Sequence, residues 1–373
     1  MTRIPAAALA SAALATVALG GAACGSGVPA DPATAFREVA GGLAARAEES
    51  GVTTVPGRGD WLFFAPELRH VSLGAFWGAR AAEVSRARRA EAADPLPGIL
   101  DFAARLDAAG VDLLVVPVPP KSVVYADELS PSLAVASPPP RLDPDHQAFY
   151  ARLREAGVDV LDLTEPLLAA RDHPEGPVYC RHDTHWSGVG CVIAGRHIAA
   201  AVRARPWYGD LPRTGHEGEW RDATITGDLT LGLDPPPSGE RLRLREVRRA
   251  GATPAGDPAP TPPEAPVPPS PPVAPDPASP VVLLGDSHNL VFHAGGDMHA
   301  TGAGLPDQLA FELGVAVDLV AVRGAASTAA RVNLLRRAQR DPAYWDGKRM
   351  VIWCFAAREL TEGDGWPVVP IRP

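Results

Sequence analysis

Basic clusters and internal hydrophobic runs are scarce in this 373-residue sequence. The formal net charge is −9, the pI is near 5.6, and no Lys/Arg-rich run occurs. A nucleic-acid partner is therefore disfavoured, because phosphate binding requires a basic face. Beyond the N-terminus no stretch approaches about 18 consecutive apolar residues, so we expect no internal transmembrane helix.

The first 24 residues are typical of an export signal. Arg3 is a minimal positive region, an Ala-rich apolar run extends from Ile4 to Ala23, and small residues lead to Cys24. The alternatives are ordinary cleavage near residues 21–23 and lipoprotein processing, in which Cys24 would carry a lipid anchor. We exclude residues 1–24 from the fold. We expect an exported protein, either periplasmic or membrane-anchored on the outer side of the cytoplasmic membrane.

Cysteine is also rare, with four residues in the whole chain: Cys24, Cys180, Cys191 and Cys354. No C-x2-C spacing occurs, which disfavours a zinc site, and we expect no metal and no other cofactor. An exported compartment permits a disulfide. Cys180 and Cys191 are the nearest pair, and buried free thiols are the equal alternative.

The chain is rich in hydrophobic residues (46%), which is enough for one large domain, and many of its 41 prolines lie in a single stretch. Residues 25–54 are expected to form a tether and an N-terminal helix from Pro32 to Glu49. Residues 55–373 form the main domain. It is interrupted at about 235–279 by a Pro-rich insertion, which is strand-like only over 241–249 and otherwise extended and mobile.

Strands and helices alternate along the main domain. The predicted strands are 111–117, 158–163, 280–284, 317–322 and 349–355, and the predicted helices are 94–109, 149–156, 188–203, 306–314 and 325–339. This order predicts an α/β fold, a three-layer α/β/α sandwich around a mainly parallel sheet. Functional loops in such folds lie at the carboxyl ends of the strands.

One of these strands ends in Gly285-Asp286-Ser287. The turn would place a serine hydroxyl at the carboxyl edge of the sheet, and Gly285 permits a tight turn beside it. Backbone N–H groups just after the strand could stabilise an oxyanion. Ser287 is therefore a candidate nucleophile, and a serine that caps a turn is the alternative.

Asp183 and His185 lie two residues apart before the predicted helix at 188–203. In an extended segment both side chains project to the same side. The carboxylate can then orient the imidazole, which accepts the proton of a serine nucleophile. Ser287, His185 and Asp183 are thus the predicted catalytic triad. The alternatives are a metal site that includes His182, which should point away from His185, and a polar loop in which Ser187 caps the helix.

Six further residues that lie at or just after strand ends are weaker candidates for oxyanion stabilisation or substrate binding: Arg323, Gly324, Lys121, Tyr125, Trp353 and Arg358. Arg323 or the Gly324 N–H could assist an oxyanion, and a helix-start turn is the alternative. Trp353 is also a candidate core residue.

Together these motifs resemble a known family. Gly-Asp-Trp-Leu-Phe at 59–63, Pro-Pro-Lys-Ser at 119–122, Asp-Thr-His-Trp at 183–186, Gly-Asp-Ser at 285–287 and Arg-Glu-Leu at 358–360 follow in this order. The order is similar to that of the SGNH-hydrolase-like alginate O-acetyltransferase family (AlgX/AlgJ-like), over about 55–373 outside the insertion.

The resemblance implies an O-acetyltransferase that modifies an exopolysaccharide in the periplasm through a serine acyl-enzyme. It also implies that a membrane-bound O-acyltransferase supplies the acetyl group. The alternatives are a carbohydrate acetyl esterase with the same triad and a non-catalytic polysaccharide-binding assembly protein.

Overall fold

A parallel sheet of five strands forms the centre of the protein in a computed structural model that describes residues 31–133, 138–251 and 273–372. The strands are β3 (Asp112–Val118), β4 (Asp159–Val160), β7 (Val281–Gly285), β8 (Asp318–Ala321) and β9 (Met350–Ala356), in the order β4-β3-β9-β7-β8. Every neighbouring pair is parallel. The predicted signal segment and the middle of the Pro-rich insertion lie outside the described residues.

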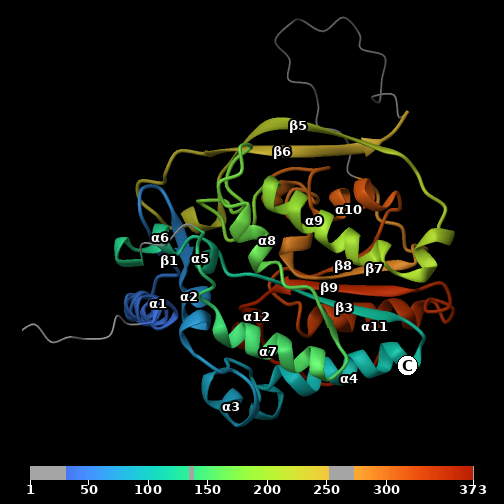
Figure 1. Cartoon of the computed structure of the whole chain (residues 1–373), viewed down its shortest axis with the longest axis horizontal. Helices are drawn as coiled ribbons and strands as arrows, with labels where there is room; N and C mark the ends of the chain where they lie inside the picture. The colour runs from blue at the N-terminus through green and yellow to red at the C-terminus, as the bar shows by residue number, and fades with distance from the viewer. Residues whose placement is uncertain (1–30, 134–137, 252–272, 373) are drawn as a thin grey trace, which may run out of the picture. The chain divides into compact units, whose positions relative to one another are not determined.

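Helices cover both faces of this sheet (Figure 1). One face carries α9 (Gly188–Arg203) and α10 (Leu305–Leu313), and the other carries α4 (Pro95–Ala108), α7 (Pro144–Glu155) and α11 (Ala329–Arg340). Along β9, Ile352 and Cys354 enter one buried hydrophobic cluster, whereas Val351, Trp353 and Phe355 enter the other. The near-continuous apolar strands follow from this double burial. The predicted α/β/α sandwich is confirmed.

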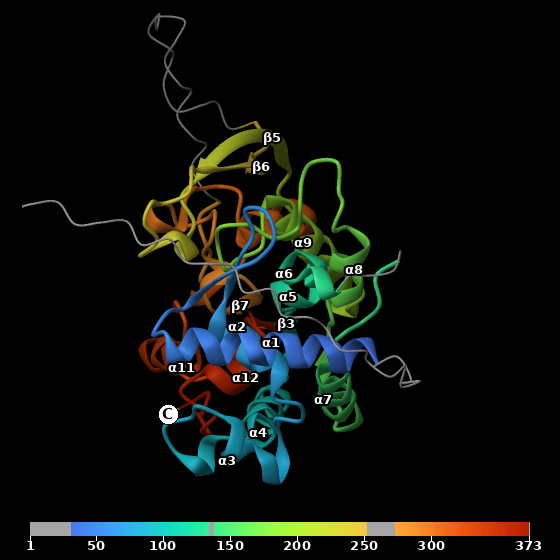
Figure 2. The same ribbon diagram turned by 90° about the vertical axis from the view of Figure 1, so that its left-hand side faces the viewer.

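The N-terminal helix belongs to the same unit, which spans Pro32–Pro373. Helix α1 (Pro32–Glu49) has the predicted bounds and lies beside α2 (Ala65–Ser72), as Figure 2 shows. Phe36 and Ala40 of α1 are buried in the core. A short hairpin of β1 (Thr54–Pro56) and β2 (Leu62–Phe64) connects α1 to α2. None of the helices in the described ranges is both long and apolar enough to cross a membrane.

The remaining helices are short. They are α3 (Ala81–Val84), α5 (Lys121–Val124), α6 (Ala126–Leu129), α8 (Thr164–Ala169) and α12 (Glu359–Glu362), with single 3-10 turns η1 (Gly78–Arg80), η2 (Ala90–Ala92), η3 (Pro131–Leu133), η4 (Pro206–Asp210), η5 (Asp228–Thr230), η6 (Ser287–Asn289) and η7 (Gly296–Met298).

An antiparallel hairpin of β5 (His216–Ile225) and β6 (Glu240–Arg249) lies above α9 and α10 in Figure 1. Leu242, Leu244 and Val247 of β6 are buried against this layer. The strand-like pattern of 241–249 is confirmed, and β5 was not predicted. Strand β6 begins one residue before the expected strand-like stretch, at Glu240, and pairs with β5 over all ten of its residues.

Three other elements differ from the prediction by more than two residues. Helix α7 begins at Pro144 rather than at 149, with Asp143 as its N-cap and the proline in its first turn. Strand β4 keeps only two of the six residues expected at 158–163, because the Asp162 carboxylate accepts a hydrogen bond from Thr164 N at 2.9 Å and begins the turn into α8. Helix α11 begins at Ala329 rather than at 325. The preceding turn includes Ser327, whose N–H donates to the Glu359 carboxylate at 3.3 Å.

Candidate active site

Ser287 lies at the carboxyl end of β7, two residues past its last residue Gly285, as the first residue of η6. Gly285 makes this position possible, because a Cβ there would lie 1.8 Å from the carbonyl oxygen of Cys354 on β9. The strand pair can therefore approach closely only with glycine at this position. Asp286 then joins the turn to the end of β9 by accepting a hydrogen bond from Ala356 N at 2.7 Å.

His185 and Asp183 meet Ser287 from the loop that precedes α9. The Nε2 atom of His185 lies 2.7 Å from Ser287 Oγ, and its Nδ1 atom lies 2.5 Å from Asp183 Oδ1. Because Nδ1 faces a carboxylate, it carries the ring proton, and Nε2 is left to accept the hydroxyl proton of Ser287. The structure thus brings together the three residues predicted as a triad, in hydrogen-bond geometry.

Burial and charge act in opposite directions on this pair. Burial disfavours the charged imidazole of His185, but the neighbouring Asp183 carboxylate outweighs this effect and raises the pKa of His185 above 6.5. Burial likewise acts against the ionised Asp183, but contact with His185 and further hydrogen bonds hold the pKa of Asp183 well below its usual value. The pair therefore favours an ionised aspartate beside a basic imidazole.

Three side chains from distant elements hold the loop that carries Asp183 and His185. Lys121 Nζ is buried and donates to the carbonyl oxygens of Cys180 (3.0 Å), Arg181 (3.3 Å) and Asp183 (2.9 Å). The Glu240 carboxylate of β6 accepts from Arg181 N at 2.8 Å and His182 N at 3.0 Å.

Asp228 of η5 holds the middle of this loop. Its carboxylate accepts from Thr184 N at 2.7 Å and from Thr184 Oγ1 at 2.6 Å. Ser187 then ends the loop as the N-cap of α9, where its hydroxyl accepts from Val189 N and Gly190 N, as predicted.

Two of the weaker candidates support loops and do not line a cleft. The Lys121 side chain contacts the three carbonyls above and is almost fully buried, so its ammonium faces the backbone of the Asp183 loop and not an open cleft. Tyr125 is also buried: its hydroxyl donates to Arg171 O at 2.8 Å and accepts from Val178 N at 2.9 Å. Lys121 and Tyr125 thus hold neighbouring loops by hydrogen bonds to their backbone groups.

The other weaker candidates have different surroundings. Trp353 is fully buried against Phe102, so it is a core residue, as its alternative interpretation predicted. The Arg323 guanidinium binds the Asp297 carboxylate, with Nη2 at 2.7 Å from Oδ1, and this ion pair turns it away from an oxyanion role. Gly324 adopts a left-handed turn with φ +62° beside it.

Arg358 remains close to the site. It follows the end of β9, its guanidinium lies over the Phe64 ring at 5.3 Å, and Nη1 lies 3.8 Å from Glu67 Oε2. Its Nη1 is buried and makes no hydrogen bond within the described residues. Burial raises the pKa of Asp286, but the neighbouring His288 and the positive charge of Arg358 outweigh this effect and lower it.

The sequence left open whether the cysteines form a disulfide or stay as free thiols. Cys180, Cys191 and Cys354 are buried free thiols, which decides between the two alternatives. Among the described residues, Asp183, His185 and Asp228 have ligand atoms within 4.8 Å of one another, a grouping that could hold a metal ion. His182 is not part of this group. Both ring nitrogens of His185 already face Asp183 and Ser287, which favours proton transfer over metal binding.

Sequence reasoning missed three residues that contact this site: Asp228, Glu240 and His299. Each lies more than 40 residues from Asp183 or its loop along the chain. No local pattern indicates such contacts, and Glu240 lies within the stretch assigned to the insertion. The only signal in the sequence for these three residues is that each is a polar residue outside the predicted helices.

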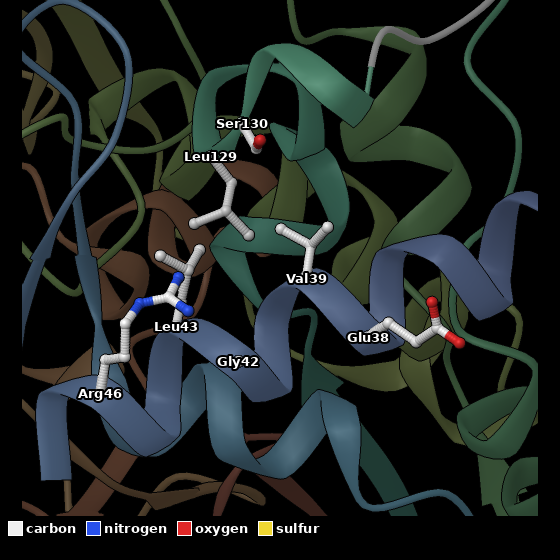
Figure 3. Close-up of a pocket in the computed structure, with 7 residues that line it drawn as sticks. All are labelled: Glu38, Val39, Gly42, Leu43, Arg46, Leu129 and Ser130. Carbon is white, nitrogen blue, oxygen red and sulfur yellow. The ribbon is translucent and has the colours of Figure 1, made fainter. Parts of the chain in front are cut away.

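A hollow at the N-terminal helix is separate from these residues (Figure 3). It has a volume of about 400 Å³ between α1 and the end of α6, with Val39, Leu43 and Leu129 along its wall and Glu38 and Arg46 at its sides. A second hollow of about 400 Å³ lies between the β5–β6 hairpin and the loop at 295–301, and His299 lines it.

A parallel α/β sandwich with a Ser–His–Asp chain at the carboxyl edge of its sheet is typical of SGNH-hydrolase-like proteins. The chain belongs to the family described as SGNH hydrolase-like domain, acetyltransferase AlgX, whose model matches residues 54–357.

Relatives are found among alginate proteins. A protein of Pseudomonas aeruginosa named as a probable alginate O-acetylase AlgJ is 32% identical over 163 residues, which are 40% of this chain and 39% of that protein. The protein of the same name from Pseudomonas syringae pv. tomato is 30% identical over 171 residues, 45% of this chain and 42% of that protein. The match thus spans about two fifths of the length of these relatives.

Two solved structures share the fold. The O-acetyltransferase domain of Pseudomonas putida AlgJ superposes with a TM-score of 0.58 at 24% identity, over 83% of this chain and 92% of that chain. Pseudomonas aeruginosa AlgX superposes with a TM-score of 0.56 at 16% identity, over 83% of this chain and 65% of that chain.

Proposed function

We propose that this protein is an O-acetyltransferase that moves an acetyl group onto hydroxyls of an exopolysaccharide through an acyl-enzyme at Ser287. The observation that carries the proposal is the hydrogen-bonded chain from Ser287 Oγ through His185 to Asp183, at 2.7 and 2.5 Å. Membership of the acetyltransferase family supports acetyl as the group transferred. The names of the alginate relatives support a polysaccharide acceptor.

In the first half-reaction, Ser287 Oγ attacks the carbonyl carbon of an acetyl ester while its proton passes to His185 Nε2. The resulting imidazolium is stabilised by the ionised Asp183. Collapse of the tetrahedral intermediate breaks the bond to the leaving oxygen, which takes the proton from His185. The products are an acetylated Ser287 and a free alcohol.

In the second half-reaction, a sugar hydroxyl gives its proton to His185 and attacks the acetyl carbon, after which Ser287 Oγ recovers the proton. Charge on the carbonyl oxygen in both steps requires nearby N–H donors. The Ser287 N–H is a suitable donor, because the first N–H groups of a helical turn have no partner within that turn. The Gly324 N–H, three residues past the end of the neighbouring strand β8, and the half-buried Arg358 guanidinium are further candidates.

The donor and the location follow from the same proposal. An exported enzyme has no acetyl-CoA supply of its own, so a membrane-bound O-acyltransferase would provide the acetyl group. The Ala-rich N-terminal segment supports export, and Cys24 is the candidate site of a lipid anchor. The enzyme would then act on the polymer outside the cytoplasmic membrane.

The test is acetyl release from a chromogenic acetyl ester, with acetylated oligosaccharides measured by mass spectrometry. Ser287→Ala should lose at least about 1,000-fold in rate. Ser122→Ala is a matched control, because Ser122 is a buried serine that follows another strand of the same sheet, β3, and its hydroxyl has no hydrogen-bond partner in the described part of the chain.

Each result has a distinct meaning. Full activity in Ser287→Ala would overturn the proposal. Ester hydrolysis that depends on Ser287, without acetylated sugar, would indicate the esterase alternative. No activity in any folded variant, even with the membrane partner supplied, would indicate a polysaccharide-binding assembly protein.

A further inference from the structure

A second histidine contacts the aspartate of the proposed triad. His299 Nε2 lies 2.9 Å from Asp183 Oδ2, on the carboxylate oxygen that His185 Nδ1 does not contact. The His299 side chain is only 10% exposed, and the Phe292 ring lies against it with centroids 5.9 Å apart. The contact is therefore part-buried, and His299 approaches from a segment 116 residues away from Asp183 in the chain.

The Asp183 carboxylate is shared between two pairs of donors. Oδ1 accepts from His185 N at 3.0 Å and from His185 Nδ1 at 2.5 Å. Oδ2 accepts from Asp228 N at 2.9 Å and from His299 Nε2 at 2.9 Å. Without His299, Oδ2 would keep a single donor, and the carboxylate could rotate about its Cβ–Cγ bond. The plane of the carboxylate sets the orientation of the His185 ring.

The backbone of His299 is held in a conformation that few side-chain-bearing residues adopt. Its φ is 72° and its ψ is −61°, and Ala300 N donates to Met298 O at 3.0 Å across it. This is the γ-turn with a positive φ at its central residue, which is rare and strained. Strained residues persist where the surrounding structure imposes them, and they gather at functional sites.

The surrounding loop imposes this turn from both sides. Phe292 N donates to Met298 O at 2.9 Å, and Gly295 N donates to Ala300 O at 2.9 Å. The ion pair of Asp297 with Arg323 joins the loop to the end of β8. The apex of the turn is thus fixed with its imidazole directed at Asp183.

We propose that His299 is a positioning residue that holds the Asp183 carboxylate in the plane required by His185, so that it acts on the reaction through Asp183. The inference rests on the proposed function of the triad. It predicts a specific effect on the acid limb of the pH–rate profile, because donation from His299 draws electron density from the carboxylate that makes His185 basic.

The sign of that effect is the same for a neutral and a charged His299. Loss of a neutral donor, or of a positive charge, leaves Asp183 better able to stabilise the His185 imidazolium, which shifts the acid limb to higher pH. The other charged groups around His299 are Asp297 and Asp228 and, across the hollow beside it, Arg221, Asp222 and Glu246. All of these remain in the variants below.

The experiment compares His299→Ala with His299→Gln in the full chain, with a chromogenic acetyl ester as substrate. The amide nitrogen of Gln can replace the Nε2 donor. The matched control is His293→Gln, because His293 lies in the same segment and contacts a different buried carboxylate, Asp307, at 2.8 Å.

His299→Ala should lower kcat by about tenfold and move the acid limb upward by roughly half a pH unit, with KM little changed. His299→Gln should keep most of kcat and the wild-type limb, and His293→Gln should leave both unchanged per folded molecule. An unmoved limb in His299→Ala, or equal losses in Ala and Gln, would overturn the inference. Activity that survives in Ser287→Ala would instead overturn the proposed function on which it rests.

Discussion

Removal of the Lys121 ammonium should separate the stability of the fold from the geometry of the active site. Lys121 donates to three carbonyls of the loop that carries Asp183 and His185. Lys121→Met keeps the apolar stem beside Phe63 but leaves these carbonyls without the charge. Arg181 O retains Leu62 N at 2.9 Å, so the carbonyls of Cys180 and Asp183 lose most.

The magnitude follows from the number of acceptors left unpaired. A buried acceptor without a partner costs about 1–3 kcal/mol, and the desolvation of the ammonium is no longer required. We expect a net loss of about 2–4 kcal/mol in the free energy of unfolding. Glu240 still holds the N–H groups of the loop, so the loop should shift without unfolding. A displacement of about 1 Å at His185 would cost about 100-fold in kcat.

The chain contains a matched control, because Lys348 is its only other lysine. Lys348 is also buried, and its Nζ donates to Pro277 O (2.6 Å), Ser279 O (2.8 Å) and Asp318 Oδ2 (2.8 Å), away from the triad. Lys348→Met should lose a similar free energy of unfolding and keep the wild-type kcat per folded molecule.

The assay combines urea denaturation, followed by tryptophan fluorescence, with ester hydrolysis corrected for the folded fraction. Equal kcat values for the two methionine variants would refute the reasoning, since they would show that the Asp183 loop keeps its geometry without Lys121. A large loss of kcat in Lys348→Met would refute it equally.

Three further outcomes are expected. Because Asp183 raises the pKa of His185 and the neutral ring is the base, kcat/KM should fall on acidification with a midpoint above 6.5, and a wild-type midpoint below this value would contradict the assignment. His70 and His146 are buried with their Nε2 atoms 2.7 Å apart, and burial lowers the pKa of both. The unfolded chain therefore binds more protons than the folded chain at acidic pH. The free energy of unfolding should be at its full value above pH 6.5 and should fall below it by up to about 1.4 kcal/mol per pH unit for each histidine. Melting temperatures from pH 8 to 5 test this, and His146→Phe should flatten the slope. Gly285→Ala should cost about 3 kcal/mol or more and abolish ester hydrolysis, whereas Gly347→Ala, with open space at its Cβ, should do neither in urea unfolding and activity assays.

Elements with strong local periodicity were predicted well. Helices α1 and α9 have the expected bounds, and each of the five sheet strands lies within one residue of, or inside, a predicted apolar run. These signals are local, because the burial of a helix or a strand determines which of its neighbouring residues are hydrophobic. The same holds for Asp183 and His185, whose spacing of two places both side chains on one side.

Contacts between distant segments were not predictable from such patterns. The β5–β6 hairpin pairs residues up to 33 positions apart, and β5 alternates too weakly to be read as a strand. Lys121 follows a strand end like a cleft residue, yet its ammonium is directed into the backbone of another loop. A sequence shows that a polar residue is present at a turn but not which buried group it will satisfy.

The sequence by itself determined the layered α/β fold, the strand that ends at Ser287, and the identity of Asp183 and His185, because these depend on periodicity and on residue type. Only the tertiary structure decided that His185 Nε2 lies 2.7 Å from Ser287, and that Lys121, Glu240, Asp228 and His299 hold the aspartate loop in place. The physical reason is that a carboxylate or ammonium can be buried only where partners from several elements converge, and that convergence is a property of packing, not of local sequence.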